Sequence, residues 1–151
     1  MKKILFLCTG NYYRSRFSEK VFNDLATQNN LSWEADSSGL ALERGVNNVG
    51  AISKYAVEAL KQRGINISTE ERFPKSPVAE DFQKFDLIIA FDESEHRPLM
   101  QERFPEFIDS IEYWLIHDID KTSPQEALTE LEKKVQELVK QLSVNSYQSN
   151  L

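Results

Sequence analysis

Two uninterrupted apolar runs predict strands that are buried on both faces. Residues 4–7, and residues 87–91 of a strand expected at 86–91, carry consecutive aliphatic and aromatic side chains and end at polar turn residues, which is the pattern of parallel strands covered by helices on either side. Residues 33–36 and 108–114 are expected to form two further strands. The first strand ends at Cys8.

Between these strands, apolar residues three or four positions apart predict helices. In the first of them, Phe17, Val21 and Leu25 share one face. The expected helices cover residues 15–29, 52–64, 78–85, 92–103 and 124–142. Strands that alternate with helices predict an α/β fold, here a single three-layer domain with a four-stranded parallel sheet and helices on both faces. The domain is expected over residues 1–142, followed by a polar, frayed tail at 143–151.

Composition and charge limit the kinds of binding partner that the chain can have. The 151 residues include 18 Lys and Arg against 24 Asp and Glu, a net charge of −6, which argues against binding nucleic acid through a basic surface. Any anion must therefore be held by a local site. The apolar run at 4–7 is too short for an export signal or a membrane span. With Cys8 as the one cysteine, an internal disulfide and a cysteine metal cluster are excluded, and a cytoplasmic location is expected.

The candidate chemistry lies in the loop after the first strand, C-T-G-N-Y-Y-R-S. Ligands of parallel sheets bind at the carboxyl ends of the strands, and loop N–H groups followed by a helix N-terminus form an anion cradle that favours a thiolate at Cys8. Gly10 allows a sharp turn and Asn11 tolerates left-handed dihedral angles. Arg14 offers a planar fork for two phosphate oxygens, and Ser15 caps the helix or donates to the thiolate. A lone cysteine at a strand end is more often a small apolar residue, but the strand–turn–helix context favours the anion site.

This loop resembles C-x-G-N-x-C-R-S of the low-molecular-weight protein tyrosine phosphatases, which share their fold with a group of arsenate reductases. The residues that match in place are Cys8, Gly10, Asn11, Arg14 and Ser15. Residues 36–39, 63–65 and 85–93 resemble that family's D-S-A-G, its R-G-I and the strand with the acidic residue after it. The resemblance spans about residues 1–142 and implies a flavodoxin-like fold.

The resemblance also implies a mechanism that needs no metal and no cofactor. Cys8 would attack phosphorus and form a phosphocysteine, while Arg14 and the loop amides hold the phosphoryl oxygens. An aspartate in a later loop would protonate the leaving oxygen and then activate water. The residues expected to contact the substrate are Thr9, Gly10, Asn11, Tyr12, Tyr13 and Ser15.

The chain departs from the family pattern at the second loop cysteine and at the acid. Tyr13 replaces that cysteine, so the family's protective disulfide cannot form. The Asp-Pro-Tyr-Tyr stretch is missing, but Asp118 lies four residues after Trp114, the spacing of the catalytic aspartate in the arsenate reductases, with Asp120 as its competitor. The aromatic pair that flanks a phosphotyrosine ring is therefore absent, and Tyr12 and Tyr13 are its candidate replacements. His96 and His117 are expected at the surface.

These observations predict a phosphomonoester phosphatase, with a protein tyrosine phosphatase as the leading form. Its partners would be a phosphorylated protein or a small phosphoester, with phosphate as product or inhibitor. Two alternatives stay open: an arsenate reductase that uses an external thiol, and a non-catalytic module that binds phosphate or phosphoproteins. The sequence predicts neither the preferred substrate nor the oligomeric state.

Overall fold

Four parallel strands form one sheet with helices on both faces. The computed structural model of the chain describes residues 1–116 and 123–149. The strands are β1 (Lys2–Cys8), β2 (Trp33–Gly39), β3 (Leu87–Ala90) and β4 (Glu112–Tyr113), in the spatial order β2-β1-β3-β4. The helices are α1 (Arg14–Gln28), α2 (Lys54–Gln62), α3 (Asp81–Lys84), α4 (Glu93–Arg103) and α5 (Pro124–Ser149). The predicted three-layer α/β architecture is confirmed.

The strand order places a switch point between β1 and β3. The chain leaves β1 toward β2 on one side and returns to β3 on the other side. Cys8 pairs with Gly39, and Leu7 pairs with Ala90, so the carboxyl ends of the three strands meet at one edge of the sheet. Open α/β sheets bind their ligands at such an edge.

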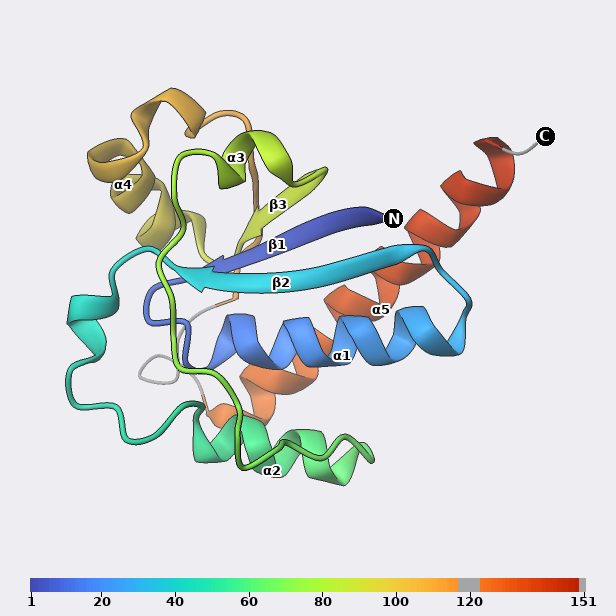
Figure 1. Cartoon of the computed structure of the whole chain (residues 1–151), viewed down its shortest axis with the longest axis horizontal. Coiled ribbons are helices and arrows are strands. Elements are labelled where there is room, and N and C mark those ends of the chain that lie inside the picture. Colours follow the sequence, from blue (N-terminus) through green and yellow to red (C-terminus); the bar gives the residue numbers. More distant parts are fainter. Residues whose placement is uncertain (117–122, 150–151) are drawn as a thin grey trace.

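Two apolar clusters, one on each face of the sheet, fix this arrangement. Figure 1 shows α1, α2 and the beginning of α5 below the sheet and α3 and α4 above it, while the C-terminal half of α5 extends past the sheet. In the lower layer, Phe6 of β1 packs on Phe22 of α1 and on Phe91, with ring centroids 6.0 and 5.5 Å apart. In the upper layer, Phe82 stacks on Phe107 at 5.0 Å. Aromatic pairs of this kind stabilise the fold beyond the burial of their apolar area; they hold α1 against β1 and α3 against the turn at Pro105–Phe107.

Two expected elements differ in extent. The strand predicted at 108–114 contains only Glu112–Tyr113, because residues 108–111 form turns and bends that continue from the 3-10 turn at Pro105–Phe107. The apolar side chains of Phe107, Ile108 and Ile111 pack on the upper cluster from turns rather than from a strand, and no periodicity distinguishes these two cases. The last helix continues beyond 142 to Ser149, so the polar segment expected to fray is helical for most of its length.

Among the helices of the described part of the chain, none is both long enough and apolar enough to cross a membrane.

Candidate active site

The loop between β1 and α1 presents backbone donors that the protein itself does not use. Within residues 1–116 and 123–149, the N–H groups of Thr9, Gly10, Asn11 and Tyr12 donate to no protein acceptor. The carbonyls behave differently, since those of Cys8, Thr9 and Tyr12 accept from Leu40, Ala41 and Ser53 at 2.8, 2.9 and 2.8 Å. Buried N–H groups are rarely left unpaired. Four successive free donors before a helix N-terminus therefore form a site for an anion.

The sharp point of this loop is Asn11 rather than Gly10. Asn11 has a φ of 51°, the left-handed region that Asn tolerates well, and a Cβ on Gly10 would meet only ordinary contacts. The steric requirement lies at Gly39, at the end of β2. A Cβ there would lie 2.7 Å from the Thr9 carbonyl oxygen and 2.8 Å from the Asn11 nitrogen. Gly39 thus allows β2 to approach the loop backbone closely.

Cys8 receives a hydrogen bond from Ser15. The two side chains lie 2.9 Å apart, and the Asn11 amide nitrogen donates to the same Ser15 oxygen at 2.8 Å. The orientation of that amide follows from its other end, where the Asn11 oxygen accepts from Arg72 and from the Lys75 N–H at 2.9 and 3.1 Å. The Ser15 oxygen is therefore an acceptor toward Asn11, which leaves its own proton for sulfur. Ser15 does not cap the helix, because Tyr13 occupies the N-cap position.

Arg14 is buried beside Cys8. It is 1% exposed and Cys8 is 2% exposed. Its Nη1 donates to the Ile116 carbonyl at 3.1 Å, and its Nη2 donates to Glu95 Oε2 at 2.8 Å. A guanidinium held in this way keeps a planar edge in a fixed direction, which suits bidentate contact with phosphoryl oxygens.

A pocket of about 230 Å³ opens over these two residues. Its lining residues are Cys8, Tyr12, Tyr13, Arg14, Asn48, Ser53 and Tyr55. The Tyr12 hydroxyl donates to the Val49 carbonyl at 2.5 Å, and Tyr13 is 6% exposed. Tyr55, on α2, is 44% exposed and supplies a third ring. The pocket therefore combines the sulfur of a free cysteine and a guanidinium with aromatic walls.

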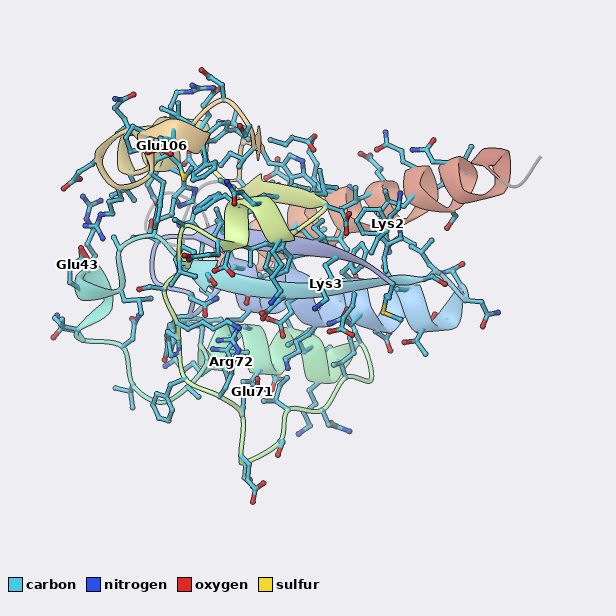
Figure 2. The ribbon with its side chains drawn as sticks, turned by 45° about the horizontal axis from the view of Figure 1, so that its top comes forward. Lys2, Lys3, Glu43, Glu71, Arg72 and Glu106 are labelled. Carbon is cyan, nitrogen blue, oxygen red and sulfur yellow. The ribbon has the colours of Figure 1, made fainter. Side chains whose placement is uncertain are left out.

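Two arginines, Arg16 and Arg72, support the loop from the α1 side. Arg16, which is fully buried, donates to the carbonyls of Ala51 and Arg72 at 2.9 and 2.7 Å and pairs with Glu71 at 2.9 Å. Figure 2 shows Arg72 and Glu71 together on the segment between α2 and α3, which passes the end of β2. Burial and the nearby charge of Arg72 lower the pKa of Arg16, although an arginine remains cationic. These contacts fix Asn11 and, through it, Ser15.

The first turn of α4 supports the loop from the opposite side. His96, expected at the surface, is fully buried, and its Nε2 lies 2.9 Å from Glu95 Oε2 and 3.1 Å from the Thr9 hydroxyl. The hydroxyl of Thr9 also donates to Glu95. Burial alone would raise the pKa of Glu95, but hydrogen bonds from His96, Thr9 and Arg14 and the charge of Arg14 hold it far below its usual range. Burial lowers the pKa of His96.

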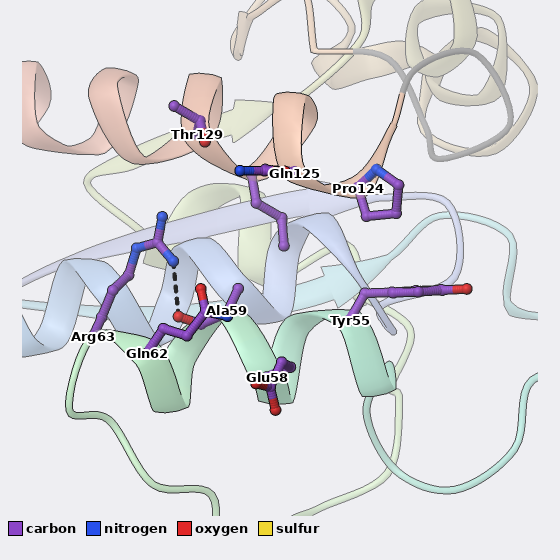
Figure 3. Close-up of a pocket in the computed structure, with 9 residues that line it drawn as sticks. Tyr55, Glu58, Ala59, Gln62, Arg63, Pro124, Gln125 and Thr129 are labelled. Carbon is purple, nitrogen blue, oxygen red and sulfur yellow. Dashed lines mark hydrogen bonds between the residues drawn. The ribbon is translucent and has the colours of Figure 1, made fainter.

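A second hollow, of about 300 Å³, lies between α2 and α5. Figure 3 shows Tyr55 toward one end of it and Arg63 toward the other, where the guanidinium donates to the Ala59 carbonyl at 2.8 Å. Tyr55 lines both hollows, so this one and the Cys8 pocket lie next to each other at Tyr55.

The structure therefore brings the expected loop residues together and adds others. Cys8, Tyr12, Tyr13 and Arg14 share one pocket, whereas Thr9, Gly10, Asn11 and Ser15 belong to the same loop and helix start without lining that pocket. Asp118, Asp120 and His117 lie outside the described residues. Tyr55, Glu95 and His96 were not predicted for the site. Of these three, only the burial of His96 could have been inferred from the sequence, since its spacing to Leu99 and Met100 places it on the inner face of α4. Among described residues, no three His, Cys, Asp or Glu side chains are grouped as metal ligands.

A thiol, a guanidinium and N–H groups that have no acceptor in the described residues lie together at the switch point of a parallel sheet, which is the class of α/β protein whose ligand site is at the carboxyl ends of the strands. The chain belongs to the low molecular weight phosphotyrosine protein phosphatase family, whose family model matches residues 3–148. This agrees with the resemblance found in the loop motif.

Individual relatives match to different extents. The low molecular weight phosphotyrosine protein phosphatase of Sus scrofa is 40% identical over 101 residues, 65% of this chain and 60% of that protein. The chain thus matches about three fifths of that relative's length. A protein-arginine-phosphatase of Bacillus subtilis is 27% identical over 152 residues, which cover 92% and 95% of the two chains. The crystal structure of a low molecular weight protein tyrosine phosphatase from T. tengcongensis superposes with a TM-score of 0.76 at 28% identity, over 93% and 99% of the two chains.

Proposed function

We propose that the chain is a phosphomonoester phosphatase whose nucleophile is the Cys8 thiolate. The observation that carries this proposal is that Cys8 and the Arg14 guanidinium line one pocket, beside a loop whose N–H groups from Thr9 to Tyr12 donate to no acceptor within residues 1–116 and 123–149. Such preorganised donors stabilise the charge that develops on the equatorial oxygens during phosphoryl transfer. A binding site for phosphate alone would not need a hydroxyl that donates to a cysteine sulfur.

The reaction has two steps. In the first, Cys8 Sγ forms a bond to phosphorus as the bond to the ester oxygen breaks, and the leaving oxygen takes a proton. In the second, water attacks phosphorus, the S–P bond breaks, and inorganic phosphate leaves with the thiolate restored. Arg14 and the loop N–H groups hold the phosphoryl oxygens in both steps. We assign the proton transfers to Asp118, on its spacing from Trp114.

The walls of the pocket favour an aryl phosphate among phosphomonoesters. The rings of Tyr12, Tyr13 and Tyr55 line the pocket above Cys8, and stacked or edge-on rings would contribute to binding a phosphotyrosine side chain. One relative's name specifies arginine instead, so phosphoarginine is the second candidate. Since Cys8 must remain reduced and has no cysteine partner, a reducing compartment such as the cytoplasm suits this chemistry.

A substrate panel tests the proposal and its alternatives. Phenyl phosphate, a phosphotyrosine peptide, a phosphoserine peptide, phosphoarginine and arsenate would be offered to the wild type and to Cys8→Ser. We expect hydrolysis of aryl phosphates by the wild type and none by Cys8→Ser. Thiol-dependent reduction of arsenate without ester hydrolysis would establish the reductase. Phosphate binding with no turnover of any substrate would establish the binding module.

A further inference from the structure

One carboxylate outside the Cys8 pocket accepts from two donors at the ends of the phosphate-binding loop and from a third on α4. Glu95 Oε2 accepts from the Thr9 hydroxyl, lies 2.8 Å from Arg14 Nη2 and lies 2.9 Å from His96 Nε2. Thr9 is the first residue after the nucleophile and Arg14 is the sixth. Glu95 therefore ties the start and the end of the loop to the first turn of α4.

The proton on the His96 ring helps to hold the Glu95 carboxylate in this position. His96 Nδ1 accepts from the backbone N–H of Asp92 at 3.0 Å, so Nδ1 carries no proton and the neutral ring must carry it on Nε2. That proton points at Glu95 Oε2 and the Thr9 hydroxyl. A second proton on Nδ1 would face the Asp92 N–H and break this bond. His96 is thus a neutral donor that holds the carboxylate in place.

We propose that Glu95 is a positioning residue that sets the direction of the Arg14 guanidinium. Arg14 lines the Cys8 pocket, whereas Glu95 is not among the described residues that line it, so the carboxylate approaches the guanidinium from outside the substrate site. The inference rests on the proposed function, in which Arg14 grips the phosphoryl group. Together with the Ile116 carbonyl on Nη1, Glu95 fixes the plane of the guanidinium fork.

The negative charge of Glu95 has a second effect, opposite in sign. It offsets part of the positive field that Arg14 offers to a phosphate dianion. Loss of this charge should therefore strengthen phosphate binding in the ground state, while loss of the fixed guanidinium direction should slow the chemical steps. Small misplacements of a catalytic group can cost about 100-fold in rate. A residue needed only for folding would instead weaken both binding and turnover.

The test compares Glu95→Gln with Glu93→Gln. Glu93 lies in the same helical turn, but its side chain is 55% exposed and pairs with Arg97 at 2.9 Å, so the control removes the same charge without touching the loop. For each variant, kcat and KM on phenyl phosphate, the inhibition constant of inorganic phosphate and the thermal unfolding midpoint would be measured. We expect Glu95→Gln to lower kcat about 10- to 100-fold while phosphate binds severalfold more tightly, and Glu93→Gln to stay near the wild type.

Two results would overturn the inference: a kcat for Glu95→Gln equal to that of Glu93→Gln, or a lower kcat with weaker phosphate binding and a lower unfolding midpoint. Failure of the proposed function is distinguishable, because the wild type would then hydrolyse phenyl phosphate no faster than Cys8→Ser. In that event, phosphate affinity measured by titration calorimetry still tests whether Glu95 acts on Arg14. Tighter binding to Glu95→Gln than to Glu93→Gln supports the contact with Arg14, and equal affinities reject it.

Discussion

Ser15→Ala removes the hydroxyl that donates to the Cys8 sulfur and leaves the rest of the loop bonded. The hydroxyl lies 2.9 Å from Sγ, and both residues are buried. The Asn11 amide nitrogen keeps its second acceptor, the Ser37 hydroxyl at 2.9 Å, so the substitution strands no other donor. The change therefore isolates one hydrogen bond to the nucleophile.

The expected magnitude follows from the charge on sulfur. A hydrogen bond to a charged group contributes about 1.5–3 kcal/mol, which corresponds to roughly 10- to 150-fold in rate. The bond matters most in the second step, where Cys8 leaves phosphorus as a thiolate and the donor stabilises the charge that appears. Phosphoenzyme breakdown should slow more than its formation, so kcat should fall and phosphocysteine should accumulate.

Rapid-mixing kinetics with an aryl phosphate measures both steps. We expect Ser15→Ala to release a burst of phenol equal to the enzyme concentration, followed by slow turnover. Ser18→Ala is the matched control, since Ser18 is also buried on α1 but its hydroxyl has no hydrogen-bond partner among the described residues; it should behave as the wild type. A kcat for Ser15→Ala within about twofold of the wild type, without a burst, would refute the reasoning.

Three further predictions concern Arg14, Glu95 and the acid. Arg14→Lys keeps the charge but loses the planar fork, so kcat on phenyl phosphate should fall about 100-fold or more, while thermal unfolding shows a retained fold; near wild-type turnover would make Arg14 structural. Because the pKa of Glu95 is lowered in the folded chain, its contribution to stability is present above its unfolded value of about 4.3 and is lost as pH falls below it. Denaturant unfolding between about pH 6 and pH 3 should therefore show a shallower acid loss in Glu95→Gln than in the wild type, and parallel curves would contradict this. Asp118→Asn should steepen the dependence of rate on leaving-group pKa in a series of aryl esters and Asp120→Asn should not; the opposite result would transfer the acid role to Asp120.

The parts of the site that could be predicted from sequence are local in the chain. Cys8, Asn11 and Arg14 belong to one strand–turn–helix unit, so an apolar run, a turn and a helical period suffice to place them at the carboxyl edge of a parallel sheet. For the Ser15 hydroxyl, the sequence allowed two roles, a helix cap and a hydrogen-bond donor to the Cys8 sulfur. Only the position of Tyr13 as the N-cap and the Asn11 bond decided between these two roles.

The parts that could not be predicted depend on contacts between distant segments. Tyr55 reaches the Cys8 pocket from α2, and Glu95 reaches Arg14 across 81 positions of sequence. An acidic residue in the first turn of a helix is favoured by the helix dipole alone, so Glu95 gave no sign of a second role. The extent of the strand predicted at 108–114 was wrong for a related reason. Phe107 and Ile108 are apolar because they pack on the upper cluster from a turn, and the sequence alone does not distinguish this from a strand.

The loop must keep N–H groups available for an anion and still hold one conformation, and charged side chains around it help to meet both requirements. Its N–H groups from Thr9 to Tyr12, which donate to no acceptor in the described residues, are kept available for an anion, so only the loop carbonyls take part in backbone hydrogen bonds. Side chains add the remaining support, with Arg72 on the Asn11 amide at 2.9 Å on one side and Glu95 on Thr9 and Arg14 on the other. Neither Arg72 nor Glu95 is among the described residues that line the pocket. Substitutions that change the geometry of catalysis should therefore occur on both faces of the sheet, at positions that a list of pocket residues would omit.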